Sequence, residues 1–295
     1  MVLLCVSVIA LLLFWRIHRD TPLPALIQRF PEGNSALVHV DVAALREAGL
    51  LDLIAGTPDQ EEAAYRKFVA DSGFNYRTDL DAIIAAIYEN ETFLFLRGRF
   101  DWGRLNRYVK ERNGSTYNGF CRVRGSQPDR QISFFALTPS IMALASSRDS
   151  WAATALQRRH SSRKSVEIPD APVWMETTGA HLSTSPWLPA GARAFVSPLT
   201  EAGRIILSAG PAETGFAIHL EAQCGTPATA ARLATKLEAV TQLLGNLIRR
   251  EGKTPSEQDL SGVLTAGTFQ WEGTIVRGRW PLPTAFLKTL AANAP

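Results

Sequence analysis

The sequence predicts an α+β fold in which two related halves, each a sheet with helices packed on one face, follow an apolar N-terminal helix. Residues 215–224 alternate apolar and polar side chains, as a half-buried β-strand does. Residues 226–250 repeat apolar side chains at three- and four-residue steps, which is typical of an amphipathic helix. The order of strand, helix and hairpin occurs in both halves, which indicates a remote duplication with antiparallel or mixed sheets.

Proline-bearing and polar stretches divide the chain. Residues 21–34 contain three prolines and end near a glycine, which favours a spacer. Residues 160–172 are basic at the start and proline-bearing at the end, which favours a linker between the halves. The expected organisation is a membrane anchor (1–20), a spacer (21–34), a first α+β half (35–159), a linker (160–172) and a second α+β half (173–295).

The long helix of the second half has clear signals at both ends. Thr226 supplies an N-cap hydroxyl, and Pro227 occupies the first helical position, where a backbone N–H is not needed. Gly252 can adopt the left-handed conformation that ends a helix. We expect further elements in this half at 193–199 and 203–209 (a strand pair), 268–281 (a strand pair that turns at Glu272-Gly273) and 284–292 (a helix).

The first half shows the same kinds of element. Asp101 is a predicted N-cap, and Gly73 and Asn113-Gly114 are predicted helix stops. The expected strands are 36–42, 80–88, 92–99, 117–124, 131–137 and 140–146, and the expected helices are 43–54, 57–73, 101–112 and 148–158.

Composition bounds the class of protein. The chain has 295 residues, 46% hydrophobic and 20% charged, with a net charge of +3, which is too small to indicate a nucleic-acid partner. Cys5 lies in the apolar leader. Cys121 and Cys224 are isolated in strand-like segments, so we expect two buried thiols, with a disulfide between them as an alternative in an oxidising compartment.

The amino terminus resembles a membrane anchor. Residues 2–15 are apolar except for Ser7, and Trp15 stands at the edge of this stretch before Arg16 and Arg19. A helix of this length spans about 21 Å of a hydrocarbon core of roughly 30 Å, so it is short for a transmembrane helix. A buried N-terminal strand is the alternative.

The expected orientation depends on where the basic residues lie. Lys and Arg occur only after the apolar stretch, and by the positive-inside rule this would keep the bulk of the chain in the cytoplasm. If a basic region precedes the given start, the bulk would instead be exported. We expect a cell-membrane protein with an extracytoplasmic bulk.

Three stretches carry a resemblance to a known group of proteins. They are FPEGNSALVHVDVAALREAGLLDLIAG, YRKFVADSGFNYRTDLDAI before a hairpin that ends in GRFD, and GFAIHLEAQCGTPATAARLATKLEAV before another hairpin. The chain resembles uncharacterised bacterial membrane-anchored proteins with a duplicated α+β extracytoplasmic region, over most of its length after residue 25. The resemblance implies a membrane-linked envelope protein and no particular activity.

No catalytic, cofactor or metal motif withstands a check of its context. The tripeptide Gly252-Lys253-Thr254 follows a helix, whereas a phosphate-binding loop follows a strand. The histidines are scattered without metal-ligand spacing, and His39 and His219 are expected to be structural. Asp79 and Asp81 could act as a carboxylate pair, but solvation at a strand start is the simpler interpretation.

Charge is uneven within the first half. Residues 41–91 hold eleven acids and four bases, whereas residues 97–130 hold nine bases and three acids. The two segments can offset each other across one domain. If they do not, a contact surface for anionic lipid headgroups or an acidic partner is expected from basic residues interleaved with aromatic ones, namely Arg97, Arg99, Trp102, Arg104, Arg107, Arg122 and Arg124.

The function expected from the sequence is therefore a membrane-tethered, non-enzymatic binding or scaffold protein of the bacterial cell envelope. Its partners would be the membrane, through residues 1–20, and an envelope protein or anionic lipid headgroups. No cofactor is expected. The alternative is a hydrolase-like enzyme whose site is assembled from residues distant in sequence. A deep pocket with converging Asp, His or Ser side chains would favour the enzyme, and a broad exposed face would favour the scaffold.

Overall fold

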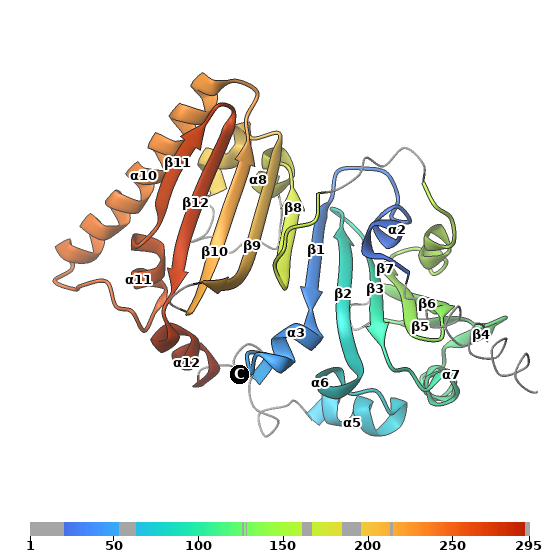
Figure 1. Ribbon diagram of the computed structural model, residues 1–295. Helices are drawn as coiled ribbons and strands as arrows, with labels where there is room; N and C mark the ends of the chain where they lie inside the picture. The colour runs from blue at the N-terminus through green and yellow to red at the C-terminus, as the bar shows by residue number, and fades with distance from the viewer. Residues whose placement is uncertain are drawn as a thin grey trace, which may run out of the picture.

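The computed structural model describes residues 21–52, 63–125, 127, 129–160, 167–184, 196–212 and 215–292. The chain has a mixed α+β fold built on one large antiparallel sheet (Figure 1). The sheet has twelve strands in the spatial order β11-β12-β10-β9-β8-β1-β2-β3-β7-β6-β5-β4. The strands are β1 (Ala36–Asp41), β2 (Leu80–Ile87), β3 (Thr92–Gly98), β4 (Ser115–Tyr117), β5 (Phe120–Arg124), β6 (Gln131–Thr138), β7 (Ile141–Ser147), β8 (Val173–Thr177), β9 (Arg204–Ala212), β10 (Gly215–Gln223), β11 (Thr268–Glu272) and β12 (Ile275–Leu282).

Helices cover parts of both faces of this sheet. Most are short, and α10 is much the longest of the described helices, at 24 residues. The α-helices are α2 (Leu23–Ile27), α3 (Val42–Glu47), α5 (Ala63–Ser72), α6 (Tyr76–Asp79), α7 (Trp102–Glu111), α8 (Gly179–Thr184), α10 (Pro227–Arg250), α11 (Leu260–Thr265) and α12 (Thr284–Ala292), and the 3-10 helices are η2 (Ala152–Gln157) and η3 (Ser197–Glu201).

The two expected halves meet at the centre of the sheet. β1 and β8 pair over four residue pairs, from Leu37 opposite Glu176 to Val40 opposite Val173. On one side of this pair the strands follow in the order β2, β3, β7, β6, and on the other side in the order β9, β10, β12, β11. The halves therefore share one continuous sheet, and the first five strands from the centre follow an equivalent order on both sides, with β5 and β4 added beyond β6 in the first half.

One face of the sheet, the helical face, carries both α7 and α10. Leu105 and Val109 of α7 pack on Phe134, and Leu237 of α10 packs on Leu220. A row of cross-strand partners runs from Phe134 to Leu220 across eight strands, so the two helices lie on the same side. Apolar burial against these helices forms two of the described cores.

Among the described helices, those that cover the reverse face lie over the first half. α2 and η2 pack there on Phe93, Phe95 and Phe135 in a third core. A second row of partners leads from Phe135 through β7, β3, β2, β1, β8 and β9 to His219, which is exposed. The expectation that helices pack on one face is thus wrong for the first half, because this half has described helices on both faces.

The expected spacer is also part of the fold. Leu26 and Phe30 are fully buried in the core under α2, which begins right after Pro22. The prolines do not prevent this, because proline suits the first positions of a helix. Residues 1–20, the expected anchor, lie outside the described residues. None of the helices in the described ranges is long and apolar enough to cross a membrane.

Three local predictions need correction. The strand expected at 117–124 is a hairpin, because Asn118 and Gly119 adopt positive φ of 48° and 77° and turn the chain between β4 and β5. The helix expected at 148–158 is the 3-10 helix η2, whose Ala153 N–H donates to the buried hydroxyl of Ser133. Of the strand expected at 193–199, residues 197–199 belong to the 3-10 helix η3, and 193–195 lie outside the described residues.

Other predictions are confirmed. Thr226 caps α10, which runs from Pro227 to Arg250, and Gly252 has a φ of 72°. Asp101 caps α7 through the N–H of Arg104 at 2.9 Å. The hairpins at 80–99 and 268–282 and the helix at 284–292 form as expected. The start of the helix expected from residue 57 lies outside the described residues. The helix expected at 43–54 is wrong, because α3 ends at Glu47 and Gly49 adopts a positive φ of 69° that turns the chain.

Candidate functional site

The structure does not bring the predicted basic and aromatic residues onto one surface. Arg97 alternates along β3 with residues of the helical face, so it lies on the reverse face with Phe95. Arg122 and Arg124 also lie on the reverse face, because Cys121, the residue before Arg122 on β5, faces α7. Trp102, Arg104 and Arg107 belong to α7, on the helical face. The set is therefore split between two sides of the sheet.

Three of these arginines are engaged with backbone oxygens of this chain. Arg97 donates to the carbonyl of Thr21 at 2.7 Å, and Arg104 donates to that of Ala70 at 2.6 Å. Arg99 donates to the Thr78 carbonyl and pairs with Asp79 at 3.5 Å. These hydrogen bonds from guanidinium groups to backbone carbonyls stabilise the contacts between segments of the chain. The three arginines are therefore less available to bind a ligand.

The remaining members of the set differ in their surroundings. Trp102 donates its indole N–H to the Pro139 carbonyl at 3.0 Å. The guanidinium of Arg122 lies over the ring of Trp151, 4.2 Å from its centroid. Arg107 and Arg124 are exposed.

A different surface gathers polar residues from several strands. It is the uncovered part of the reverse face, on the second half, and we refer to it as the open face. One row of partners across it is Ser208, His219 and Arg279, and the next is Ile206, Glu221 and Arg277. The open face comprises Glu176, Arg204, Ile206, Ser208, His219, Glu221, Gln223, Thr268, Gln270, Glu272, Arg277 and Arg279.

Ion pairs order the side chains of the open face. Arg277 lies 3.8 Å from Glu221 and 3.3 Å from Glu272. Arg204 binds Glu176 at 2.9 Å and Glu167 at 3.6 Å. The hydrogen bond that Arg204 donates to the Glu176 carboxylate raises the pKa of Arg204. These partly exposed pairs contribute little stability, so their main effect is to fix the positions of charges.

The segment before β8 forms a wall along the open face. Pro172 and Ala171 pack beside Gly210 of β9, where a Cβ would meet the proline ring at 3.4 Å. Between this wall and the strands is a cavity of about 380 Å³. Its lining includes Glu167 and Asp170 from the wall and Ser208, His219, Glu221 and Arg277 from the sheet.

Where the open face meets the centre of the sheet, a half-buried imidazole stacks on a buried indole. His39 of β1 and Trp174 of β8 are cross-strand partners, and their ring centroids lie 5.6 Å apart. His39 Nδ1 and Trp174 Nε1 are buried and have no hydrogen-bond partner in the part of the chain that the structure describes. Burial lowers the pKa of His39, which Asp41 raises and Arg97 lowers further. The lowered pKa favours the neutral form of the His39 imidazole.

The open face places a serine, a histidine and a carboxylate close together on neighbouring strands. Ser208 and His219 are direct partners with Glu221 on the same face, yet the Ser208 hydroxyl and the His219 ring form no hydrogen bond with each other. An activated serine needs that bond. Alternation in residues 275–282 puts Arg277 and Arg279 on the face opposite Val276, and this signal could have identified them from the sequence.

Other candidate groups have structural surroundings. Asp79 accepts from the N–H of Asn75 at 2.9 Å, and Asp81 lies 3.7 Å from Arg46. Cys121 and Cys224 are free, buried thiols in separate cores, and burial raises the pKa of Cys121 to about 11. Within the described ranges, no group of three or more His, Cys, Asp and Glu side chains is placed to hold a metal ion.

Comparison with known proteins bears on the fold alone. No protein-family model matches the chain, and no curated protein matches it. Crystal form I of TP0453 is similar in structure, with a TM-score of 0.52 and 15% sequence identity over 93% of this chain and 97% of that one. Crystal form III of TP0453 gives a TM-score of 0.48 at 14% identity over 92% and 97%. The chain thus shares its overall fold with TP0453, at an identity that carries no functional assignment.

Proposed function

We propose that this chain is a membrane-tethered, non-enzymatic binding or scaffold protein of the bacterial cell envelope, and that the open face is its binding surface. One observation carries the proposal. The reverse face of the sheet is covered by α2 and η2 over the first half, and over the second half it presents charged side chains from four neighbouring strands. Flat, polar sheet faces of this kind suit a macromolecular partner better than a small molecule.

The charges of the open face indicate the chemistry of the partner. Carboxylates outnumber guanidinium groups there, because the ion pairs and the wall contribute Glu167, Asp170, Glu176, Glu221 and Glu272 against Arg204, Arg277 and Arg279. Such a surface repels anionic lipid headgroups and nucleic acid, and it complements an envelope protein with a mixed or basic surface. We therefore favour a protein partner for this face.

Site-specific crosslinking tests this assignment. Benzoylphenylalanine would replace His219 on the open face or Thr235 on the exposed side of α10, in the full chain within cells. We expect a discrete protein adduct from position 219 that is lost when Glu221→Arg and Arg279→Glu reverse two charges of the face. Equal adducts from both positions, or an adduct that persists after charge reversal, would overturn the proposal.

The tether rests on the apolar residues 2–15. We propose that residues 1–20 hold the chain in the cell membrane and that its bulk is extracytoplasmic. A reporter that is active only outside the cytoplasm, fused to the C-terminus, should be active. A cytoplasmic signal would contradict the location, and release of the chain by alkaline carbonate would contradict the anchor.

The two halves have the arrangement expected of an internal duplication, and we infer one. β1 and β8 are each followed by a short helix whose first turn is capped by a side chain, through Asp41 and Thr178. β3 and β10 each lead to a capped helix on the helical face, α7 or α10. Superposition of β1, β2, β3, β7 and β6 on β8, β9, β10, β12 and β11 should align the strands in order, and a failure to align would refute the duplication.

A hydrolase is the second candidate, because Ser208, His219 and Glu221 share the same cavity. Neighbouring residues on antiparallel strands have Cβ atoms about 5 Å apart, so a rotamer change can bring hydroxyl and imidazole together. If this reading holds, the full chain should hydrolyse activated esters and Ser208→Ala should abolish turnover, whereas Ser183→Ala, at an exposed serine of α8, should not. Equal rates in the two variants would exclude it.

A further inference from the structure

Strand β11 forms one edge of the sheet, and its pairing with β12 is regular. It pairs with β12 through five consecutive residue pairs without a register shift. Its sequence, Thr268-Phe-Gln-Trp-Glu272, contains neither proline nor lysine, which are common means of protecting an edge. The opposite edge strand, β4, has three residues. Among the described residues no strand pairs with the outer side of β11, so its outer backbone groups can pair with another strand.

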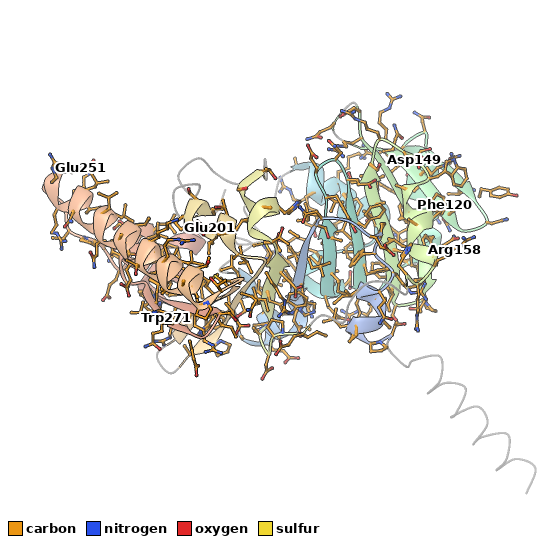
Figure 2. All side chains as sticks on the ribbon, turned by 90° about the horizontal axis from the view of Figure 1, so that it is seen from above. Phe120, Asp149, Arg158, Glu201, Glu251 and Trp271 are labelled. Atoms are coloured by element: carbon orange, nitrogen blue, oxygen red, sulfur yellow. The ribbon has the colours of Figure 1, made fainter. Side chains whose placement is uncertain are left out.

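The aromatic side chains of β11 are unequally covered. Phe269 is buried under α10, whereas Trp271 on the same face is 51% exposed. Figure 2 shows Trp271 and Glu251 at the end of the molecule opposite Phe120 and Arg158. A large ring beside an open strand edge is a feature of surfaces that bind a partner.

We propose that the chain forms a two-fold symmetric homodimer in which β11 pairs antiparallel with β11 of a second copy, centred on Gln270. This register uses all five residues of the strand, because each residue from Thr268 to Glu272 then has a partner. It places Trp271 beside the partner subunit's Phe269, and the two-fold repeats this aromatic pair. Gln270 meets its own copy across the axis.

Charges on the open face complement each other in this arrangement. Glu272, whose side chain is 86% exposed, stands opposite the partner subunit's Thr268. Thr268 is paired on its other side with Arg279, an exposed arginine. Each Glu272 thus approaches the partner's Arg279, and the two Glu272 side chains lie at opposite ends of the strand pair, away from each other.

The dimer joins two sheets into one and does not depend on the binding function proposed above. A five-residue strand pair with one aromatic cluster buries less than the roughly 1,000 Å² of a strong interface. We therefore expect a weak dimer in dilute solution. Tethering to one membrane would raise the effective concentration and favour the dimer.

Cysteine crosslinking tests the register directly, with the full chain in detergent and Cys5→Ser to remove the one cysteine outside the described residues. Gln270→Cys places two thiols on the axis, with Cα atoms about 5 Å apart, within reach of a disulfide. Glu272→Cys is the matched control, because its two copies lie about 14 Å apart. Thr268→Cys together with Glu272→Cys should crosslink again. Crosslinking of Glu272→Cys alone, or none with Gln270→Cys, would overturn the proposal.

Sedimentation equilibrium of the full chain gives an independent measurement. We expect concentration-dependent dimers, at least tenfold weaker for Gln270→Lys, which places two like charges on the axis without disturbing a buried residue. A monomer at all concentrations would reject the dimer. Open-ended oligomers would reject it as well, because they would indicate pairing of β11 with a different surface, such as β4.

Discussion

The imidazole of His39 stacks on the indole of Trp174 across the strand pair that joins the two halves, with the ring planes 28° apart. The indole comes from the second half but lies in the core formed by α2, η2 and the first half. Only 1% of the Trp174 surface is exposed. A side chain of β8, which follows the linker, therefore completes the core of the first half.

Trp174→Ala should destabilise the protein severely. Removing a fully buried indole leaves a cavity, and the loss of free energy of unfolding is expected to be about 3–5 kcal/mol. Urea unfolding followed by circular dichroism measures it. Trp271→Ala is the matched control, because the exposed indole of β11 should change the stability of the monomer by less than about 0.5 kcal/mol. Equal losses in both variants would contradict the packing described here.

Stability should depend on pH through His39. Burial lowers the pKa of His39 in the folded chain below its ordinary value of 6.5, so the unfolded chain binds the proton more readily. The free energy of unfolding should therefore be highest above that value and should decrease as the pH falls from it towards the lowered pKa. Urea midpoints measured between pH 5 and pH 8 should show this slope. His39→Gln should flatten it, and an unchanged slope would assign the effect to other groups.

The two buried thiols should be protected in the native state. Cys121 and Cys224 are nearly inaccessible, and burial raises the pKa of both thiols, so the reactive thiolate is disfavoured. In the Cys5→Ser chain, a disulfide reagent at pH 8 should label neither thiol before unfolding and both after it. Labelling of a native thiol at the rate of free cysteine would show that its core opens.

The N-cap of α10 offers a measurement with an internal control. Thr226 accepts a hydrogen bond from the Thr229 N–H at 3.2 Å, and Thr226→Ala should cost about 1 kcal/mol of stability. Thr235 lies exposed within the same helix, so Thr235→Ala should stabilise the chain by roughly 0.5 kcal/mol through helix propensity. Thermal or urea unfolding distinguishes the two, and the same sign in both variants would be unexpected.

Local signals predicted the elements that they govern. The Thr226-Pro227 start, the Asp101 cap and the turn at Gly273 are encoded within a few residues, and all three form as expected. The helix expected at 148–158 failed because contacts with β6, including the Ser133 hydroxyl, favour a 3-10 turn over the local helical pattern.

Long-range features were beyond the reach of these signals. The pairing of β1 with β8 joins residues more than a hundred positions apart, and neither strand carries a mark of its partner. The predicted basic surface failed to gather because strand alternation puts Arg97 on one face and α7 lies on the other. The wet side of 215–224, with His219 and Glu221, was predicted, but which strands flank it was not.

Helix α12 is a second case in which a side chain from the second half packs in a core of the first half. Leu287 of α12 packs with Leu45 and Leu50 near the start of the chain, as Trp174 packs beneath α2. Neither half can then be separated intact from the other. A cut at the linker would remove side chains that fill the cores of each half. We therefore expect the cores of the first half to be completed only after the residues around Trp174 and Leu287 have been synthesised, so that a fragment lacking them would expose apolar surface.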